Sequence, residues 1–188
     1  MGKVRVTVDT EDNKSRPVKK PRASEDTVAR LNQFHPTESQ KEAINVARGH
    51  TLSIVEGVPG SGKSTKAKSM VASNPNLVHL EADMFFEASG EYKFDPTFLS
   101  TAHDWCYSNT VFNLLSGKDV VVTNTFTKMW ELESYLAIGQ RLGCDITIIE
   151  MKSEYGSIHG VPEAKLQQMK ARWEELPEEL KKSVHYYE

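Results

Sequence analysis

The sequence has 188 residues, of which 38% are hydrophobic and 26% are charged, so it can build the core of one ordinary globular domain. No apolar run approaches the ~18 residues of a membrane span, and the N-terminus lacks the apolar stretch of a secretory signal. Cys106 and Cys144 have no paired spacing, which favours reduced core thiols over a disulfide. We therefore expect a cytoplasmic protein with no membrane contact; the sequence leaves its oligomeric state open.

The charge is divided unevenly along the chain. Residues 1–35 carry 8 basic and 5 acidic residues, a net charge of +3, whereas the rest carries 15 and 21, a net of −6. Residues 14–22 hold five basic residues, two prolines and no acid, a composition typical of disorder. This segment is either a solvated tail, or an arm that binds nucleic acid or directs the protein to the nucleus. We expect a basic leader at 1–35, in which the alternating residues 4–8 could add an edge strand, a domain at 36–176 and a tail at 177–188.

The first predicted helix runs from Thr37 to about Arg48. Pro36 precedes it, Thr37 can cap it, and Gln40 completes the pattern of a capping box. The stretch FHPTESQKEAI also resembles the Q-motif of superfamily 1 helicases, which implies that Gln40 contacts adenine. Both interpretations of Gln40, as a cap residue and as an adenine contact, remain open at this point.

The most informative stretch is LSIVEGVPGSGKST, residues 52–65. A strand at 52–55 leads into the pattern G-x-x-x-x-G-K-[ST] at 57–64, and a helix at 64–72 follows, as a phosphate-binding loop requires. Backbone N–H groups and the helix N-terminus would hold the phosphates of ATP, with Lys63 at the β- and γ-phosphates and Ser64 on Mg²⁺. The predicted nucleotide-binding residues are Gln40, Pro59, Gly60, Ser61, Gly62, Lys63, Ser64 and Thr65.

A second strand is predicted at 76–81, and Asp83 follows its carboxyl end. Ligands of open α/β sheets bind at this edge, so Asp83 could accept the proton of an attacking hydroxyl. The alternative is that Asp83 only caps the next turn. The segment 85–94 has aromatic residues at its edges, as a flap or a substrate contact would.

Further elements repeat the order of strand, loop and helix. We expect helices at 96–116, 129–142 and 162–176, strands at 120–122 and 144–151, and one or two more helical turns in the tail. His103 lies near the packed face of its helix, where a structural role is favoured over a functional one. The pattern predicts a three-layer α/β fold, with a parallel sheet of four to five strands flanked by helices.

Five blocks in this order carry a family resemblance: GVPGSGKST, ADMFF, YKFDPTFLSTAHDW, VVVTNT and IHGVPEAKLQQMKARW. They resemble the P-loop kinase group that contains the bacteriophage 5′-hydroxyl polynucleotide kinase domain and the NEDD4-binding-protein-2-like ATPases. The resemblance implies ATP- and Mg²⁺-dependent phosphoryl transfer with Lys63 and Asp83 as catalytic residues. It also implies an acceptor side at Asn124 and Thr125, with His103 as a candidate, and a lid over ATP with Lys152, His159 and Arg172.

The chain departs from the family's phage kinases in three blocks. Phe86 stands where they have an arginine, Phe126 where they have an asparagine, and Tyr155-Gly156-Ser157 where their lid carries arginines that clamp the γ-phosphate. We expect a kinase acting on a polynucleotide 5′-hydroxyl, with a small nucleoside, nucleotide or sugar as the alternative acceptor. A nucleotide-binding ATPase or binding module without phosphotransfer is the remaining alternative.

Overall fold

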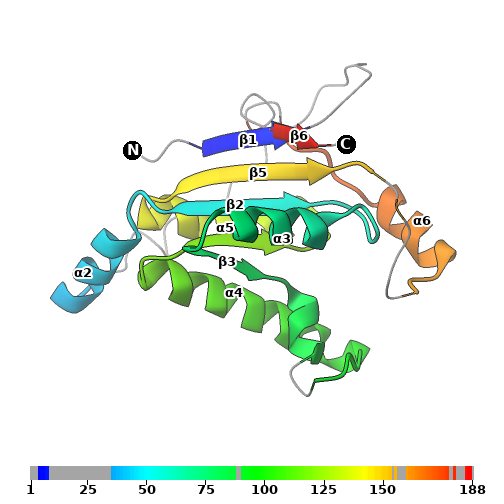
Figure 1. The fold of residues 1–188 in the computed structure, drawn as a ribbon, viewed down its shortest axis with the longest axis horizontal. Coiled ribbons are helices and arrows are strands. Elements are labelled where there is room, and N and C mark those ends of the chain that lie inside the picture. The colour runs from blue at the N-terminus through cyan, green and yellow to red at the C-terminus, as the bar shows by residue number, and fades with distance from the viewer. Residues whose placement is uncertain are drawn as a thin grey trace.

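The computed structural model of the chain is built on a six-stranded parallel sheet (Figure 1). The structure describes residues 4–8, 35–87, 90–153, 155, 160–177, 180 and 185–187. The strands lie in the order β1-β6-β5-β2-β4-β3. Their bounds are β1 Val4–Val8, β2 Thr51–Glu56, β3 Leu77–Leu80, β4 Asp119–Thr123, β5 Asp145–Met151 and β6 His185–Tyr187.

Helices cover both faces of the sheet. They are α2 Glu38–Ala47, α3 Lys63–Ser73, α4 Leu99–Leu115, α5 Met129–Leu142 and α6 Glu163–Ala171, with 3-10 helices η1 Ala82–Glu87 and η2 Pro96–Phe98. One core cluster packs α2, α4 and α5 on one face, and a smaller one packs α3 on the other. The predicted three-layer α/β fold with a parallel sheet is confirmed, and the sheet has six strands where four to five were expected.

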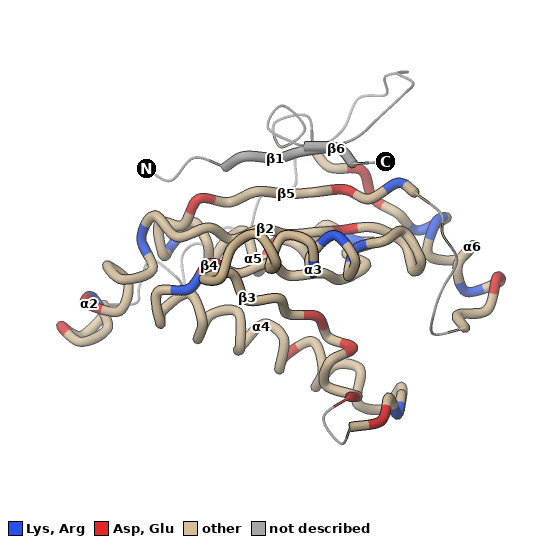
Figure 2. The backbone as a smooth tube through the Cα atoms, viewed as in Figure 1, with Lys and Arg blue, Asp and Glu red and all other residues tan. Residues whose placement is uncertain are grey.

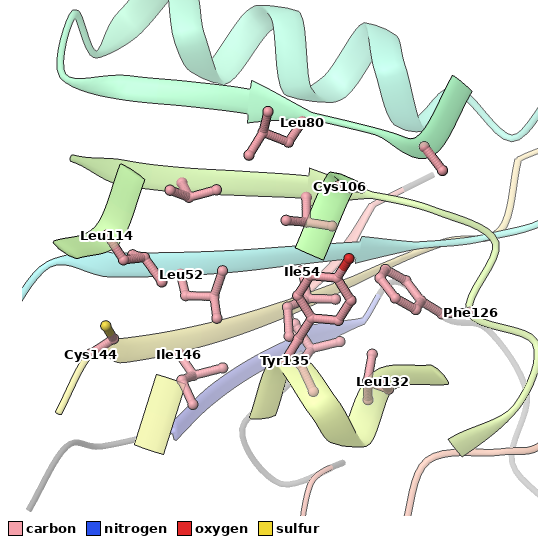
Figure 3. Close-up of a cluster of buried hydrophobic side chains, with 14 of the residues drawn as sticks. Leu52, Ile54, Leu80, Cys106, Leu114, Phe126, Leu132, Tyr135, Cys144 and Ile146 are labelled. Carbon is pink, nitrogen blue, oxygen red and sulfur yellow. The ribbon is translucent and has the colours of Figure 1, made fainter. Parts of the chain in front are cut away.

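The strands supply both clusters by alternation, because successive side chains point to opposite faces. In β4, Val120 and Val122 belong to the larger cluster and Val121 to the smaller one, and all three are fully buried. Figure 3 shows the larger cluster, in which the aromatic ring of Tyr135 from α5 packs against Phe126. Cys106 and Cys144 are buried free thiols, as predicted.

The two termini add strands beside β5. The alternation in the leader predicted an edge strand, and Val4–Val8 does pair in parallel with β5 and β6. The rest of the leader, including the basic segment 14–22, lies outside the described residues. One or two helical turns were expected in the tail, and Leu180 is helical, with its N–H donating to the Pro177 carbonyl at 2.8 Å. Further along, His185–Tyr187 forms β6, because a run of histidine and two tyrosines suits a strand better than a helix. Among the described helices, none is long and apolar enough to cross a membrane.

The last predicted helix is shorter than expected. It spans Glu163–Ala171 with Pro162 as its N-cap, and Arg172 is the C-cap, so the residues before Pro177 are not helical. Glu174 explains part of the difference, because its backbone N–H donates to the carbonyl of Thr127 at 3.0 Å and its carboxylate accepts from Met129 N and Lys128 Nζ. These tertiary contacts replace the last helical turns.

The capping box of α2 is confirmed. Gln40 Oε1 accepts from Thr37 N at 2.8 Å, and Thr37 Oγ1 accepts from Gln40 N at 3.4 Å. The helix leads into the amino end of β2, and Figure 1 places it at the opposite end of the strands from the loop that follows β2. The structure therefore does not bring Gln40 to the phosphate loop.

Replacing Gln40 with alanine should lower the free energy of unfolding by about 1 kcal/mol, because it removes half of the capping box. ATP affinity should stay unchanged, because the helix start lies away from the loop. Urea unfolding and calorimetric titration with ATP measure the two effects. Thr37→Ala removes the other half of the capping box and should lower the free energy of unfolding by a similar amount. A loss of ATP affinity in Gln40→Ala but not in Thr37→Ala would instead support the adenine contact.

Candidate active site

The carboxyl ends of β2, β3 and β4 meet at one edge of the sheet, and the predicted site residues follow these strand ends. β4 lies between β2 and β3, although β3 comes earlier in the sequence. The phosphate loop after β2 therefore faces the turn after β3, with the end of β4 between them. Sequence spacing alone could not show this, because the strand order is set by the crossover connections.

The phosphate loop requires glycine at its first position. A Cβ on Gly57 would lie 2.4 Å from Ser61 Oγ and 2.8 Å from the carbonyl oxygen of Met151. Ser61 itself is fully buried, and its Oγ has no hydrogen-bond partner within the described part of the chain. The loop thus folds tightly around a buried hydroxyl that the described residues leave without a hydrogen bond.

Gly62 ends the loop and starts α3. It adopts φ +90°, in the left-handed region, and α3 has no side-chain cap among the described residues. The first N–H groups of α3 can therefore donate to an anion, as in other phosphate-binding helices. Tyr155 lies against the same glycine: its ring would be 3.2 Å from a Cβ there, and its N–H donates to the Gly60 carbonyl at 2.9 Å.

Lys63 Nζ donates to the carbonyl of Val58 at 2.9 Å, so its ammonium group lies inside the loop. Burial lowers the pKa of Lys63 to about 8, against the opposing effect of the Glu81 and Asp83 carboxylates. Phosphate groups in the loop would stabilise the charged form of the lysine. Within the loop and the start of α3, Pro59 and Ser64 are partly buried, and Thr65 is exposed.

Glu81 is the site residue that the sequence analysis missed. Its Oε2 accepts hydrogen bonds from Ser64 Oγ and Thr123 Oγ1, both at 2.7 Å, and lies 3.5 Å from His79 Nε2. Burial raises the pKa of Glu81, but hydrogen bonds from His79, Thr123 and Ser64 outweigh it and bring the pKa to about 2. Glu81 therefore stays ionised at any working pH. The signal in the sequence was the polar pair His79 and Glu81, alternating along an otherwise apolar strand.

Asp83 lies two residues further, in the first turn of η1. The Tyr92 hydroxyl donates to its Oδ1 at 3.5 Å, and its charge acts on Lys63. Asn124 holds the preceding residue in place, because its Oδ1 accepts from the backbone N–H of Ala82 at 3.0 Å. The buried Asn124 thus fixes the turn that carries Asp83.

The remaining candidates for the acceptor side and the lid come from separate elements. The carbonyl of Thr125 accepts from Gly57 N at 3.5 Å, and His103 is exposed on α4 rather than set in a packed face. Lys152 Nζ lies 3.6 Å from Glu150 Oε1, and Arg172 is exposed at the end of α6. His159 lies outside the described residues.

Phe126 occupies an unusual backbone conformation, with φ +47°. Asparagine tolerates this left-handed region much better than phenylalanine does. The buried ring of Phe126 packs edge-on against Tyr135, with ring centroids 5.4 Å apart. This packing offsets the strain and accounts for an aromatic residue where the resembling kinases have asparagine.

Comparisons with known proteins agree with this geometry. A family model described as an AAA domain matches residues 52–155, more than half of the chain. Human NEDD4-binding protein 2 is 30% identical over 132 residues, which are 64% of this chain and 7% of that protein. The chain thus corresponds to a small part of that relative.

Two solved structures are also similar. One is the Pnkp1/Rnl/Hen1 complex, at 20% identity, covering 64% of this chain and 39% of that chain with a TM-score of 0.49. The other is a gluconokinase from Sinorhizobium meliloti 1021, at 17% identity, covering 73% and 89% with a TM-score of 0.47. The family model spans the phosphate loop, the Glu81–Asp83 turn and the end of β4. The family predicted from the sequence is therefore confirmed, and the chain belongs to the AAA domain family.

Proposed function

We propose that the protein is an ATP-dependent phosphotransferase that moves the γ-phosphate to a hydroxyl acceptor. The observation that carries this proposal is the meeting of Lys63 and Ser64 with two carboxylates, Glu81 and Asp83, at one edge of the sheet. A loop that only binds phosphate needs no second carboxylate. Phosphoryl transfer to a hydroxyl needs a group that orients and deprotonates the nucleophile.

The loop fits the phosphates of ATP. Ser61 Oγ is buried and unpartnered among the described residues, and a side chain at Gly57 would collide with Ser61 and Met151 and disrupt the loop. Gly60 to Thr65 would hold the phosphates, and Ser64 would contribute its hydroxyl to Mg²⁺. Bound Mg²⁺ would supply positive charge against the phosphate oxygens.

Each residue then has a definite task. The acceptor oxygen forms a bond to the γ-phosphorus, the bond from that phosphorus to the bridging oxygen breaks, and ADP leaves. Asp83 takes the hydroxyl proton, while Lys63 neutralises charge on the phosphates. Asn124 keeps Asp83 in position through the Ala82 N–H. Most of the rate enhancement in such a site comes from positioning and electrostatics.

For the acceptor we propose a polynucleotide 5′-hydroxyl. The exposed aromatic residues beside Asp83 support it, because bases stack on such rings. Tyr92, Phe94 and Phe98 are 36%, 51% and 50% exposed, and the first two rings pack on Phe86 of η1. The basic segment 14–22 would add affinity for phosphates.

A small hydroxyl compound is the second candidate, and the local charge favours it. The segment around the aromatic residues carries Glu87, Glu91 and Asp95, and Lys93 pairs with Glu91 at 3.1 Å. Figure 2 shows acidic residues after β3 and before α4. This surface would repel a phosphate backbone more than it would an uncharged nucleoside or sugar.

Radiolabelled phosphate transfer separates these possibilities. The protein is incubated with γ-labelled ATP and Mg²⁺ and offered 5′-hydroxyl DNA, 5′-hydroxyl RNA, nucleosides or sugars. We expect label on a 5′-hydroxyl oligonucleotide and none on a 5′-phosphorylated one. Label on nucleosides or sugars alone would select the second candidate, and ATP binding without label on any acceptor would contradict phosphotransfer.

A further inference from the structure

The strongest unassigned feature is the group of polar contacts around Glu81. A single carboxylate oxygen, Oε2, accepts hydrogen bonds from the hydroxyls of Ser64 and Thr123 at 2.7 Å each, and His79 Nε2 lies 3.5 Å from it. His79 Nε2 lies in turn 2.8 Å from Thr123 Oγ1. Within the part of the chain that the structure describes, the other oxygen, Oε1, has no hydrogen bond. The carboxylate is thus fixed in position by one oxygen and keeps the other for a ligand.

The partner of Glu81 in the loop identifies the ligand class. In P-loop proteins the serine or threonine after the lysine holds Mg²⁺, and an acid at a strand end completes the site. Here that serine is Ser64, and its hydroxyl points at Glu81. Mg²⁺ is bound through oxygen ligands, usually one or two carboxylates together with substrate phosphates and waters. One carboxylate and one hydroxyl beside a phosphate loop match this pattern. No cluster of three or more histidine, cysteine or acidic residues suited to a metal is found among the described residues. Substrate phosphates and waters would supply the remaining ligands.

The carboxyl end of β4, the strand end that usually supplies the acid, carries none here. β4 lies next to β2 and ends in Thr123, followed by Asn124. Thr123 donates to Glu81, and Asn124 holds Ala82, so both residues serve the turn after β3. The neighbouring strand β3 delivers a carboxylate to the loop in place of β4.

We propose that Glu81, acting with Ser64, is the carboxylate that binds the Mg²⁺ of the bound nucleotide, and that Thr123 and His79 hold it in place. This inference rests on the proposed function, because it assumes a nucleotide in the loop. The two acids then have different roles: Glu81 binds the cation, and Asp83 accepts the proton of the acceptor hydroxyl. Glu81 faces Ser64 at the start of α3, whereas Asp83 lies beside the exposed aromatic segment.

Nucleotide affinity with and without Mg²⁺ tests the assignment without measuring activity. The affinity of the full chain for AMP-PNP is measured by calorimetry in EDTA and in Mg²⁺, and Mn²⁺ binding to the AMP-PNP complex is followed by electron paramagnetic resonance. In the wild type, Mg²⁺ should tighten binding. Glu81→Gln should keep the wild-type affinity for AMP-PNP in EDTA. The increase in AMP-PNP affinity that Mg²⁺ produces should be at least about tenfold smaller, and Mn²⁺ should bind correspondingly more weakly, in the range seen for altered metal-site residues. Glu81→Asp keeps the charge and should restore part of the gain.

Asp83→Asn is the matched control, because it removes the other carboxylate of the site and should leave the Mg²⁺-dependent gain intact. Equal Mg²⁺ dependence in Glu81→Gln and the wild type would overturn the assignment, as would a gain lost only in Asp83→Asn. If Glu81→Gln fails to fold, Thr123→Val, which removes one of the hydroxyls on Oε2, should show a weaker form of the same loss. Absence of AMP-PNP binding by the wild type would contradict the proposed function itself, a distinct result.

Discussion

Replacing Asp83 with asparagine should lower γ-phosphate transfer by about 10²–10⁴-fold while ATP binds with wild-type affinity, a range typical of general acid–base catalysis. Asparagine keeps the size of the side chain and can still contact the Tyr92 hydroxyl, which lies 3.5 Å from Asp83 Oδ1. It cannot take a proton from an attacking hydroxyl. The change should appear in kcat, because the interaction is made only in the transition state.

A transfer assay with γ-labelled ATP and calorimetric titration with ATP measure the two effects separately. Asp104→Asn is a suitable control, because Asp104 is an exposed acid on α4 and the substitution is the same. It should leave both transfer and binding unchanged. Equal losses of binding and transfer in Asp83→Asn would assign the carboxylate to the nucleotide instead of the acceptor.

The fold could be predicted because its determinants are local. Glycine at 57 and 62, lysine at 63 and serine at 64 follow a strand pattern and precede a helix pattern, so the loop and its strand were readable as one unit. The boundaries of α5 and the glycine at its C-cap, Gly143, also follow from local signals.

The Glu81 contacts could not be predicted, because they depend on which strands are neighbours. Ser64, Glu81 and Thr123 come from three separate elements, and only the placement of β4 between β2 and β3 brings them together. The polar pair His79 and Glu81 marks a strand end in the sequence, but it does not show which elements Glu81 contacts. Asp83, in contrast, was predicted from its place after the strand at 76–81, and the family resemblance then implied the same role.

The errors at the C-terminus have a similar cause. The segment after Arg172 has helical composition, yet the contacts of Glu174 with Lys128 and Met129 hold it in a different conformation. His185–Tyr187 becomes a strand because β5 offers an edge with which it can pair. Tertiary contacts of this kind override local propensity, and single-sequence patterns do not contain them.

The second large effect concerns Glu56, the last residue of β2. Its side chain is buried, it is paired in register with Glu150, and its Oε1 has no hydrogen-bond partner among the described residues. Burial raises the pKa of Glu56 well above its usual value, Glu150 raises it further, and Lys152 partly opposes the shift. The folded protein therefore holds this carboxyl in its protonated form across a pH range in which the unfolded chain has lost the proton.

The sign of the pH dependence follows from that difference in proton binding. Where the folded state binds more protons than the unfolded state, stability falls as pH rises. The contribution of Glu56 is therefore fully present below the unfolded pKa near 4.5, and it decreases as pH rises toward the elevated folded pKa. Glu56→Gln cannot ionise and should lack this loss. We expect it to be more stable than the wild type by about 1–3 kcal/mol at pH 8 and to differ little at pH 5, because a tenfold difference in proton affinity between the folded and unfolded states is worth about 1.4 kcal/mol.

Urea unfolding of both proteins at pH 5 and pH 8 gives the difference directly. Glu42→Gln, on the exposed surface of α2, should show no comparable change with pH. A wild type that equals or exceeds Glu56→Gln in stability at pH 8 would mean that the carboxylate is ionised and compensated in the folded protein.

Glu56 directly precedes Gly57, so a charge there would also oppose phosphates entering the loop. If the carboxyl is neutral in the folded state, as its burial requires, Glu56→Gln should bind ATP as tightly as the wild type at neutral pH. It should bind more tightly once rising pH begins to ionise Glu56.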